Sequence, residues 1–248
     1  MPDALGWLVL GAAALVASTV GGVAGFGTGV IMVPIIAWTL GIKAAVPILT
    51  VAMLIGNGAR AWFSRTEVQG RVVAAFLAGS LPMTVVGATL FSRAPGATIS
   101  RVLGAFLLLA VPFRRWLLAR GTSVKLRHFP IVGGAFGLLS ALVGATGPII
   151  SPFFLGYGLR RGAYVATDAL CTVGTFALRL VVFRRNELMG AQTVAIGLFL
   201  GVVMIAGAFA GRRLLDRMSE RTFVRLIGVR LLLLGAQPQA LRQAGRSQ

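Results

Sequence analysis

One acidic residue, Asp168, lies within a long apolar stretch of the chain. A carboxylate inside a membrane is energetically costly, and such residues commonly serve in proton or substrate pathways. The polar residues that follow at steps of four, three and four share its helix face, and they are Thr172, Thr175 and Arg179. Burial favours a neutral Asp168 that exchanges protons, whereas a nearby arginine favours an ionised structural lock, and the sequence leaves both open.

A second polar stripe lies 118 residues earlier. Thr50 and Asn57 occupy the positions equivalent to Asp168 and Thr175, and Arg60 falls one residue short of matching the arginine of the first stripe. Arginines near helix ends either extend toward lipid headgroups or hold an anion through charge-assisted hydrogen bonds. The two stripes predict either two walls of one pathway or hydrogen bonding between helices.

Two glycine- and proline-rich motifs interrupt the apolar sequence at matching places. The residues expected to bind substrate there are Gly27, Thr28, Gly29 and Pro34 in the first motif, and Thr146, Gly147 and Pro148 in the second. Because glycine and proline break helices, these motifs expose helix N-termini, whose partial positive charge attracts anions. We expect the breaks to meet near the membrane midplane, with the two threonine hydroxyls as additional donors.

The composition requires this chemistry to take place in a membrane. Hydrophobic residues make up 57% of the 248 residues and charged residues 12%, with a mean hydropathy of +0.88, whereas soluble domains contain about 25% charged residues. The 24 basic and 6 acidic residues give a net charge of +18, and the basic ones cluster between apolar runs. We therefore expect loops facing anionic lipid and no nucleic-acid partner. The chain has one histidine, one cysteine and one buried acid, which leave no metal site and no nucleophile–base pair, so we also expect no cofactor or metal and no enzymatic activity.

Eight apolar segments predict an all-α integral membrane protein. Five of them fit one helix each, but the first and fifth are longer and contain the two motifs, so we expect them to be bent, unwound or re-entrant. The segments are Ala4–Leu40, Ala44–Phe63, Val72–Phe91, Ile99–Leu118, Phe129–Tyr157, Gly162–Phe183, Ala191–Gly211 and Thr222–Ala236.

The matching breaks predict an internal repeat within a single transporter domain spanning residues 1–248. The homologous halves are 1–120 and 128–236, each with one broken segment and three transmembrane helices, followed by a disordered tail at 237–248. With Arg230 set aside as intramembrane, eight plain spans would divide the basic residues 13 to 10 between the faces, whereas inverted halves with re-entrant breaks give 15 to 8. The second division favours inverted halves, with the Arg114–Arg127 loop in the cytoplasm and both termini outside.

The motifs also resemble those of a known family. Gly25–Pro34 resembles the first Gly-rich motif of the TauE/SafE sulfite exporter family (4-toluene sulfonate uptake permease group). Gly144–Pro148 with Pro152 resembles its second copy, and Arg161–Ala169 resembles its sixth segment. The resemblance implies transport of sulfite, sulfonates or related sulfur-containing organic anions across the bacterial inner membrane.

Paired, interrupted segments in two halves are typical of secondary transporters. We therefore predict a gradient-driven, multi-pass transporter of a small anion, embedded in lipid of the bacterial inner membrane, with Asp168 coupling proton movement. The alternatives are a channel or uptake permease for another organic anion, or an intramembrane scaffold or assembly factor. The sequence leaves homo-oligomerisation, direction of transport and substrate open.

Overall fold

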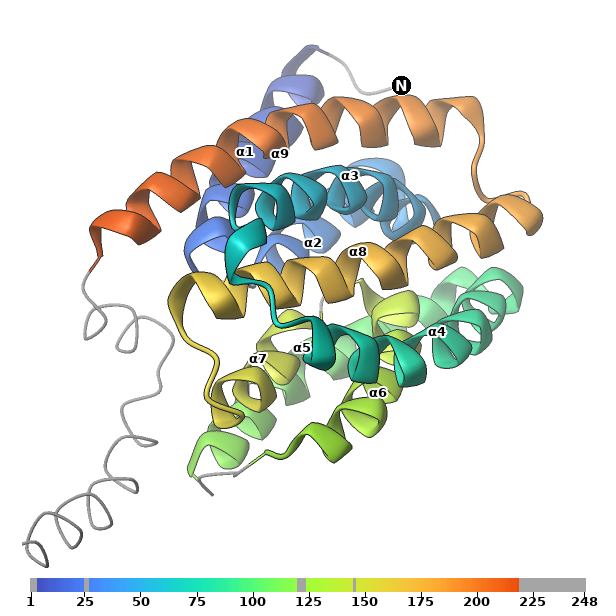
Figure 1. The fold of residues 1–248 in the computed structure, drawn as a ribbon. Coiled ribbons are helices and arrows are strands. Elements are labelled where there is room, and N and C mark those ends of the chain that lie inside the picture. The colour runs from blue at the N-terminus through green and yellow to red at the C-terminus, as the bar shows by residue number, and fades with distance from the viewer. Residues whose placement is uncertain (1–3, 25–26, 120–123, 145, 219–248) are drawn as a thin grey trace, which may run out of the picture.

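The computed structural model describes residues 4–24, 27–119, 124–144 and 146–218, and throughout these ranges the secondary structure is helical (Figure 1). Two short 3-10 helices, Arg65–Glu67 and Leu126–His128, precede α4 and α6. The α-helices are α1 (Ala4–Ala24), α2 (Thr28–Leu40), α3 (Ile42–Phe63), α4 (Gly70–Arg93), α5 (Gly96–Ala119), α6 (Phe129–Val143), α7 (Gly147–Gly156), α8 (Arg161–Arg185) and α9 (Ala191–Arg217).

Six described helical segments are long and apolar enough to cross a bilayer, namely α1, α3, α4, α6 together with the 3-10 helix before it, α8 and α9. The helix α2 and the first part of α5, Gly96–Ala110, are shorter apolar helices. The fold is therefore that of an all-α, multi-pass membrane protein, as the sequence predicts. The predicted last span, Thr222–Ala236, and the tail 237–248 lie outside the described residues.

Each predicted break separates a long helix from a short one. The first lies between α1 and α2, where Gly27 has a φ of 112°, and the second lies between α6 and α7, where Gly144 has a φ of 70°. Residues with side chains rarely adopt positive φ values, so glycine lets the chain leave the helix at both points. The sequence left open whether Ala4–Val20 could span alone, and α1 is long enough to do so.

After each break the chain turns back. At the second break, the backbone N–H of Val124, before α6, donates to the carbonyl of Gly156 at the end of α7 over 3.3 Å. The short helix thus returns to the end of the bundle at which α6 begins. At the first break, the hydroxyl of Thr28 donates to the carbonyl of Ala17 over 3.1 Å, which places the start of α2 beside α1.

The two hairpins start from opposite ends of the bundle. We call one the Arg65 end, where α3 ends and α8 begins, joined by the Gln69 N–H to Thr167 hydroxyl bond of 3.1 Å. The other is the Lys43 end, where α3 begins and α4 ends, joined by the Lys43 ammonium to Phe91 carbonyl bond of 3.0 Å. They lie at the left and right of Figure 1, respectively.

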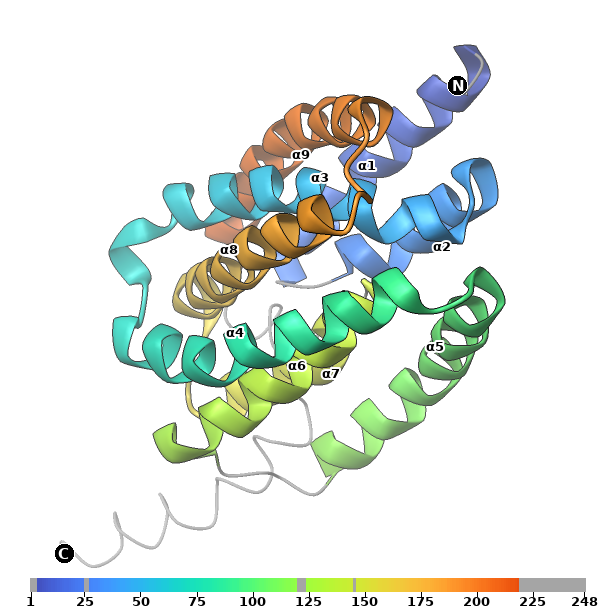
Figure 2. The same ribbon diagram turned by 90° about the vertical axis from the view of Figure 1, so that its right-hand side faces the viewer.

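The α6–α7 hairpin opens at the Arg65 end because the 3-10 helix before α6 and the start of α8 both lie there. The start of α1 lies instead beside the start of α9, since the Trp7 and Phe199 rings are 5.0 Å apart. Because α9 begins where α8 ends, the α1–α2 hairpin opens at the Lys43 end (Figure 2). The inverted topology requires this arrangement, while the homology of the halves and the membrane orientation stay predictions.

Close helix packing is made by glycines. The helix α4 packs on α6 and α8, and α9 packs on α1 and α3. A Cβ on Gly79 would collide with the backbone of Pro130, and a Cβ on Gly22 would meet the backbone of Gly211. Small residues of this kind let helices approach closely where lipid offers no hydrophobic driving force between them.

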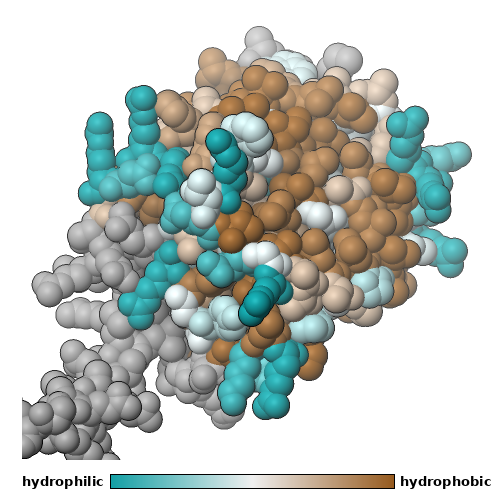
Figure 3. All heavy atoms as spheres, in the orientation of Figure 1, coloured by the Kyte–Doolittle hydropathy of each residue, from teal (hydrophilic) through white to brown (hydrophobic). Residues whose placement is uncertain are grey.

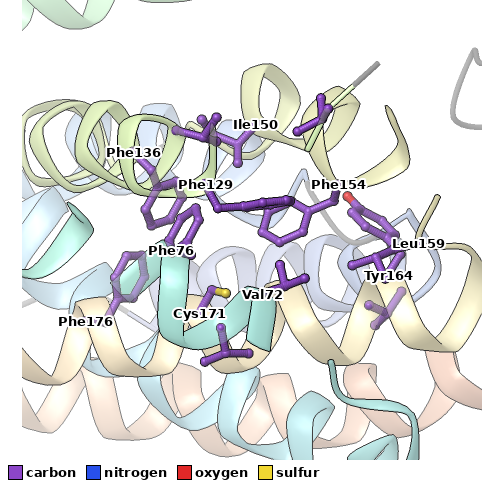
Figure 4. Packing of buried hydrophobic residues seen from close by; sticks show 14 of the residues in the cluster. Val72, Phe76, Phe129, Phe136, Ile150, Phe154, Leu159, Tyr164, Cys171 and Phe176 are labelled. Atoms are coloured by element: carbon purple, nitrogen blue, oxygen red, sulfur yellow. The ribbon is translucent and has the colours of Figure 1, made fainter. Parts of the chain in front are cut away.

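The outer surface has the polarity of a membrane protein. Hydrophilic side chains gather toward the left and right of the view in Figure 3, and hydrophobic ones cover the face between them. Inside, an aromatic cluster that includes Phe76, Phe129 and Phe154 fills the space between α4, α6, α7 and α8 (Figure 4). This cluster supports the face of α8 on which the predicted polar stripe lies.

Candidate functional site

Both breaks line one internal cavity of about 30 Å³. The remaining walls come from α3, α6 and α8, so segments far apart in the sequence meet there. Its lining residues are Gly27, Thr28, Gly29, Val30, Met53, Asn57, Arg60, Phe136, Gly144, Thr146, Gly147, Asp168, Thr172 and Phe176.

Two helix N-termini lie at this cavity. The first backbone bonds of α2 and α7 run from Ile31 to the Gly27 carbonyl and from Ile149 to the Thr146 carbonyl. Among the described residues, no side chain caps the N-terminus of either helix. The N–H groups ahead of the first bond have no partner within a helix, and they carry the positive end of its dipole. The cavity therefore has two built-in regions of positive potential.

A buried ion pair crosses the cavity wall. The Nη2 of Arg60 on α3 lies 3.3 Å from the Oδ2 of Asp168 on α8, and the side chains are 6% and 11% exposed. The guanidinium also donates to Asn57, whose amide is held by a 2.8 Å bond to the Met53 carbonyl. Arg60 thus does not extend toward headgroups. The sequence suggested an arginine near Asp168, and the structure identifies it as the arginine of the other stripe.

The threonine and proline residues of the breaks take different positions. The hydroxyl of Thr28 donates to the Ala17 carbonyl, so its role as a donor to an anion, which stays a prediction, requires that bond to be given up. Thr146 is buried at the cavity. Pro34 lies within α2 and does not line the cavity, but it lacks the N–H that would pair with the carbonyl of Val30, a lining residue. Pro148 lies in the first turn of α7.

The stripe on α8 extends beyond the cavity. Asp168 and Thr172 line it, whereas Thr175 and Arg179 do not. The Thr175 and Ser80 hydroxyls are 2.9 Å apart, and Arg179 donates to a carbonyl of α6. The helical spacing was therefore right, but farther along α8 the same face is covered by α4 and α6.

Sequence reasoning missed the apolar part of the wall. Met53, Phe136 and Phe176 line the cavity, and their side chains carry no chemical signal among many similar residues. Phe176 follows Thr172 by four residues, so including the apolar residues at helical spacing from the polar stripe would have found it.

A comparison with protein families identifies the family to which the chain belongs. The model of the family described as "Sulfite exporter TauE/SafE" matches residues 10–237, which include both breaks and both polar stripes. No curated protein and no solved structure matches the chain. This family is one of transporters rather than enzymes, which agrees with the expectation from composition. The protein belongs to the TauE/SafE sulfite exporter family.

Proposed function

We propose that this protein is a secondary active transporter of sulfite or an organosulfonate across the bacterial inner membrane, coupled to protons through Asp168. The observation that carries the proposal is the Arg60–Asp168 pair at a cavity faced by two helix N-termini. Oxyanions suit this site because guanidinium and backbone N–H groups are their usual protein partners.

The ion pair suggests how anion and proton are linked. Without substrate, the carboxylate of Asp168 neutralises Arg60. An entering oxyanion competes with that carboxylate for the guanidinium, and two negative charges side by side repel each other. A proton on Asp168 removes the repulsion. Anion and proton therefore bind together, and a gradient of one moves the other.

The cavity volume supports a carrier with alternating access. A volume of about 30 Å³ holds only one or two water molecules, so an anion of several heavy atoms requires the walls to move. The hairpins from opposite ends are the natural moving parts, because each contributes one of the two helix N-termini.

The test is flux into proteoliposomes with and without an imposed pH gradient. Sulfite, sulfoacetate and taurine are offered separately, because taurine carries a positive charge that the other two lack. We expect wild type to accumulate sulfite or sulfoacetate in the compartment into which protons flow. No flux of any of the three would refute the proposed substrate class. Flux that ignores the gradient would favour a channel or an uncoupled permease, and a scaffold would give none.

Three variants test the residues. The variant Asp168→Asn should lose gradient-driven accumulation of sulfite but keep sulfite exchange. If this variant accumulates sulfite like wild type, Asp168 is not the proton carrier. Gly29→Val and Gly147→Val should remove flux, because their side chains would fill the space at the helix N-termini. Glu67→Gln, which changes a partly exposed acidic residue outside the cavity, is the control and should transport normally.

A further inference from the structure

Arg179 is a buried cation without a counter-ion among the residues that the structure describes. Its exposure is 0%. Its Nη1 donates to the carbonyl of Ser140, in the last turn of α6, while Nε and Nη2 find no hydrogen-bond partner in the described part of the chain. Burying a charge with donors left unsatisfied is strongly destabilising. The contrast is with Arg60, which has both a carboxylate and an amide.

The two unsatisfied nitrogens of Arg179 form one edge of the guanidinium that can bind an oxyanion. Nε and Nη2 lie side by side on the guanidinium, and together they match two oxygens of a carboxylate, sulfonate or sulfite. Polar groups of a neighbouring helix lie close to this part of α8. Thr175, one helical turn before Arg179, bonds to Ser80 on α4. Two further polar residues, Ser140 on α6 and Thr84 on α4, are also buried.

A single aromatic ring connects this arginine to the cavity. The guanidinium carbon of Arg179 lies 3.7 Å from the centroid of the Phe176 ring, and Phe176 itself lines the cavity. The ring of Phe136, another lining residue, lies nearly parallel to it, with the centroids 6.5 Å apart and the planes at 12° (Figure 4). Phe176 therefore contacts both the cavity and the guanidinium of Arg179, and its movement would remove a ring that covers the guanidinium.

We propose that Arg179 is a second anion-binding station, which receives the oxyanion from the Arg60 site when the Phe176 side chain moves. The inference rests on the proposed function. The station lies three helical turns beyond Asp168 along α8, toward the Lys43 end. Phe183 follows Arg179 by four residues along α8, and its buried ring packs on the ring of Phe91, with the centroids 5.4 Å apart. The anion then passes through two sites separated by one aromatic gate, with a second apolar closure beyond.

The experiment compares purified Arg179→Gln and Arg179→Lys with wild type, using radiolabelled sulfite for binding and for proteoliposome flux. Arg184→Gln, an exposed arginine near the end of the same helix, is the matched control. We expect Arg179→Gln to keep sulfite binding at the Arg60 site and to lower flux by about 10- to 100-fold, the effect of losing a hydrogen bond to a charged group. Arg179→Lys should recover part of the flux.

Stability separates this role from a purely structural one. If Arg179 awaits an anion, Arg179→Gln removes an unsatisfied charge, so Tm without sulfite should stay the same or rise. A lowered Tm together with lost binding would show that Arg179 holds the fold, and it would overturn the proposal. So would wild-type flux in Arg179→Gln.

A second variant keeps the test independent of that one. Phe176→Leu leaves an apolar but smaller side chain, so sulfite exchange should become faster, and the gain should disappear when Arg179→Gln is added. Unchanged exchange in Phe176→Leu would overturn the gate. If wild type neither binds nor moves sulfite, sulfoacetate or taurine, the proposed function itself fails. If wild type transports and the Arg179 variants transport equally well, only the second station fails.

Discussion

The Arg60–Asp168 pair makes a quantitative prediction about stability. The two side chains are 6% and 11% exposed, so little water is available to solvate the charge that remains after Arg60→Gln or Asp168→Asn. Removing one partner of a buried pair costs about 3–5 kcal/mol. For a chain of this size, 1 kcal/mol corresponds to roughly 2–4 °C, so each single variant should lower Tm by roughly 6–20 °C.

The double variant distinguishes a pair from two separate contributions. Arg60→Gln with Asp168→Asn leaves two neutral amides, and no charge remains buried without compensation. Its loss of stability should fall short of the sum of the single losses by about 2–3 kcal/mol. The measurement is thermal unfolding of the purified proteins in detergent, followed by tryptophan fluorescence. Additive losses would refute the view that these charges compensate each other.

A second ion pair supplies the control. Arg212 and Glu67 are closer, at 2.8 Å, but their side chains are 25% and 37% exposed. Exposed pairs contribute about 0–1 kcal/mol, so Arg212→Gln should shift Tm far less than Arg60→Gln. If the closer pair contributed more, distance rather than burial would govern the effect, and the estimate for Arg60 would lose its basis.

Two further predictions concern packing and topology. Gly79→Ala should destabilise the protein by about 1–3 kcal/mol, because a Cβ there collides with the backbone of Pro130, whereas Gly104→Ala, with open space around it, should be neutral or stabilising in the same thermal assay. In a Cys171→Ala background, cysteines at Ser123 and Ser247 should label from opposite faces of the membrane, and labelling of both from one face would favour eight plain spans.

Local features of the sequence predicted the helix breaks well. Gly27 and Gly144 have the positive φ values that glycine tolerates, and their spacing within apolar segments was sufficient to locate both breaks. Length alone did not reveal that α2 and α7 turn back. That return depends on contacts such as Val124 to Gly156, between residues more than thirty positions apart, which no local propensity encodes.

The polar residues of the candidate site could be predicted from the sequence, but the ion pair between Arg60 and Asp168 could not. Helical spacing placed Asp168 and Arg60 on the right faces of α8 and α3. Which arginine reaches Asp168 depends on where the two helices cross. Each of the two helices also packs closely on a further helix: α3 on α9, where a Cβ on Gly197 would collide with Val51, and α8 on α4, where Gly174 packs on Leu77. A set of contacts between four helices has no signature in one sequence, so the neighbour of Asp168 had to be observed.

The opposed hairpins give a physical reason for the proposed anion site in the middle of this bundle. A single re-entrant hairpin brings one helix N-terminus to the bilayer interior, where one partial charge attracts an anion weakly. Hairpins from both ends bring α2 and α7 to one cavity. Arg60 adds a full positive charge, which the carboxylate of Asp168 neutralises until an anion replaces that carboxylate or a proton binds to it. The empty site therefore carries little net charge, and its positive potential appears when Asp168 is protonated. Under the proposed function, such a site would favour an anion arriving with a proton over either ion alone.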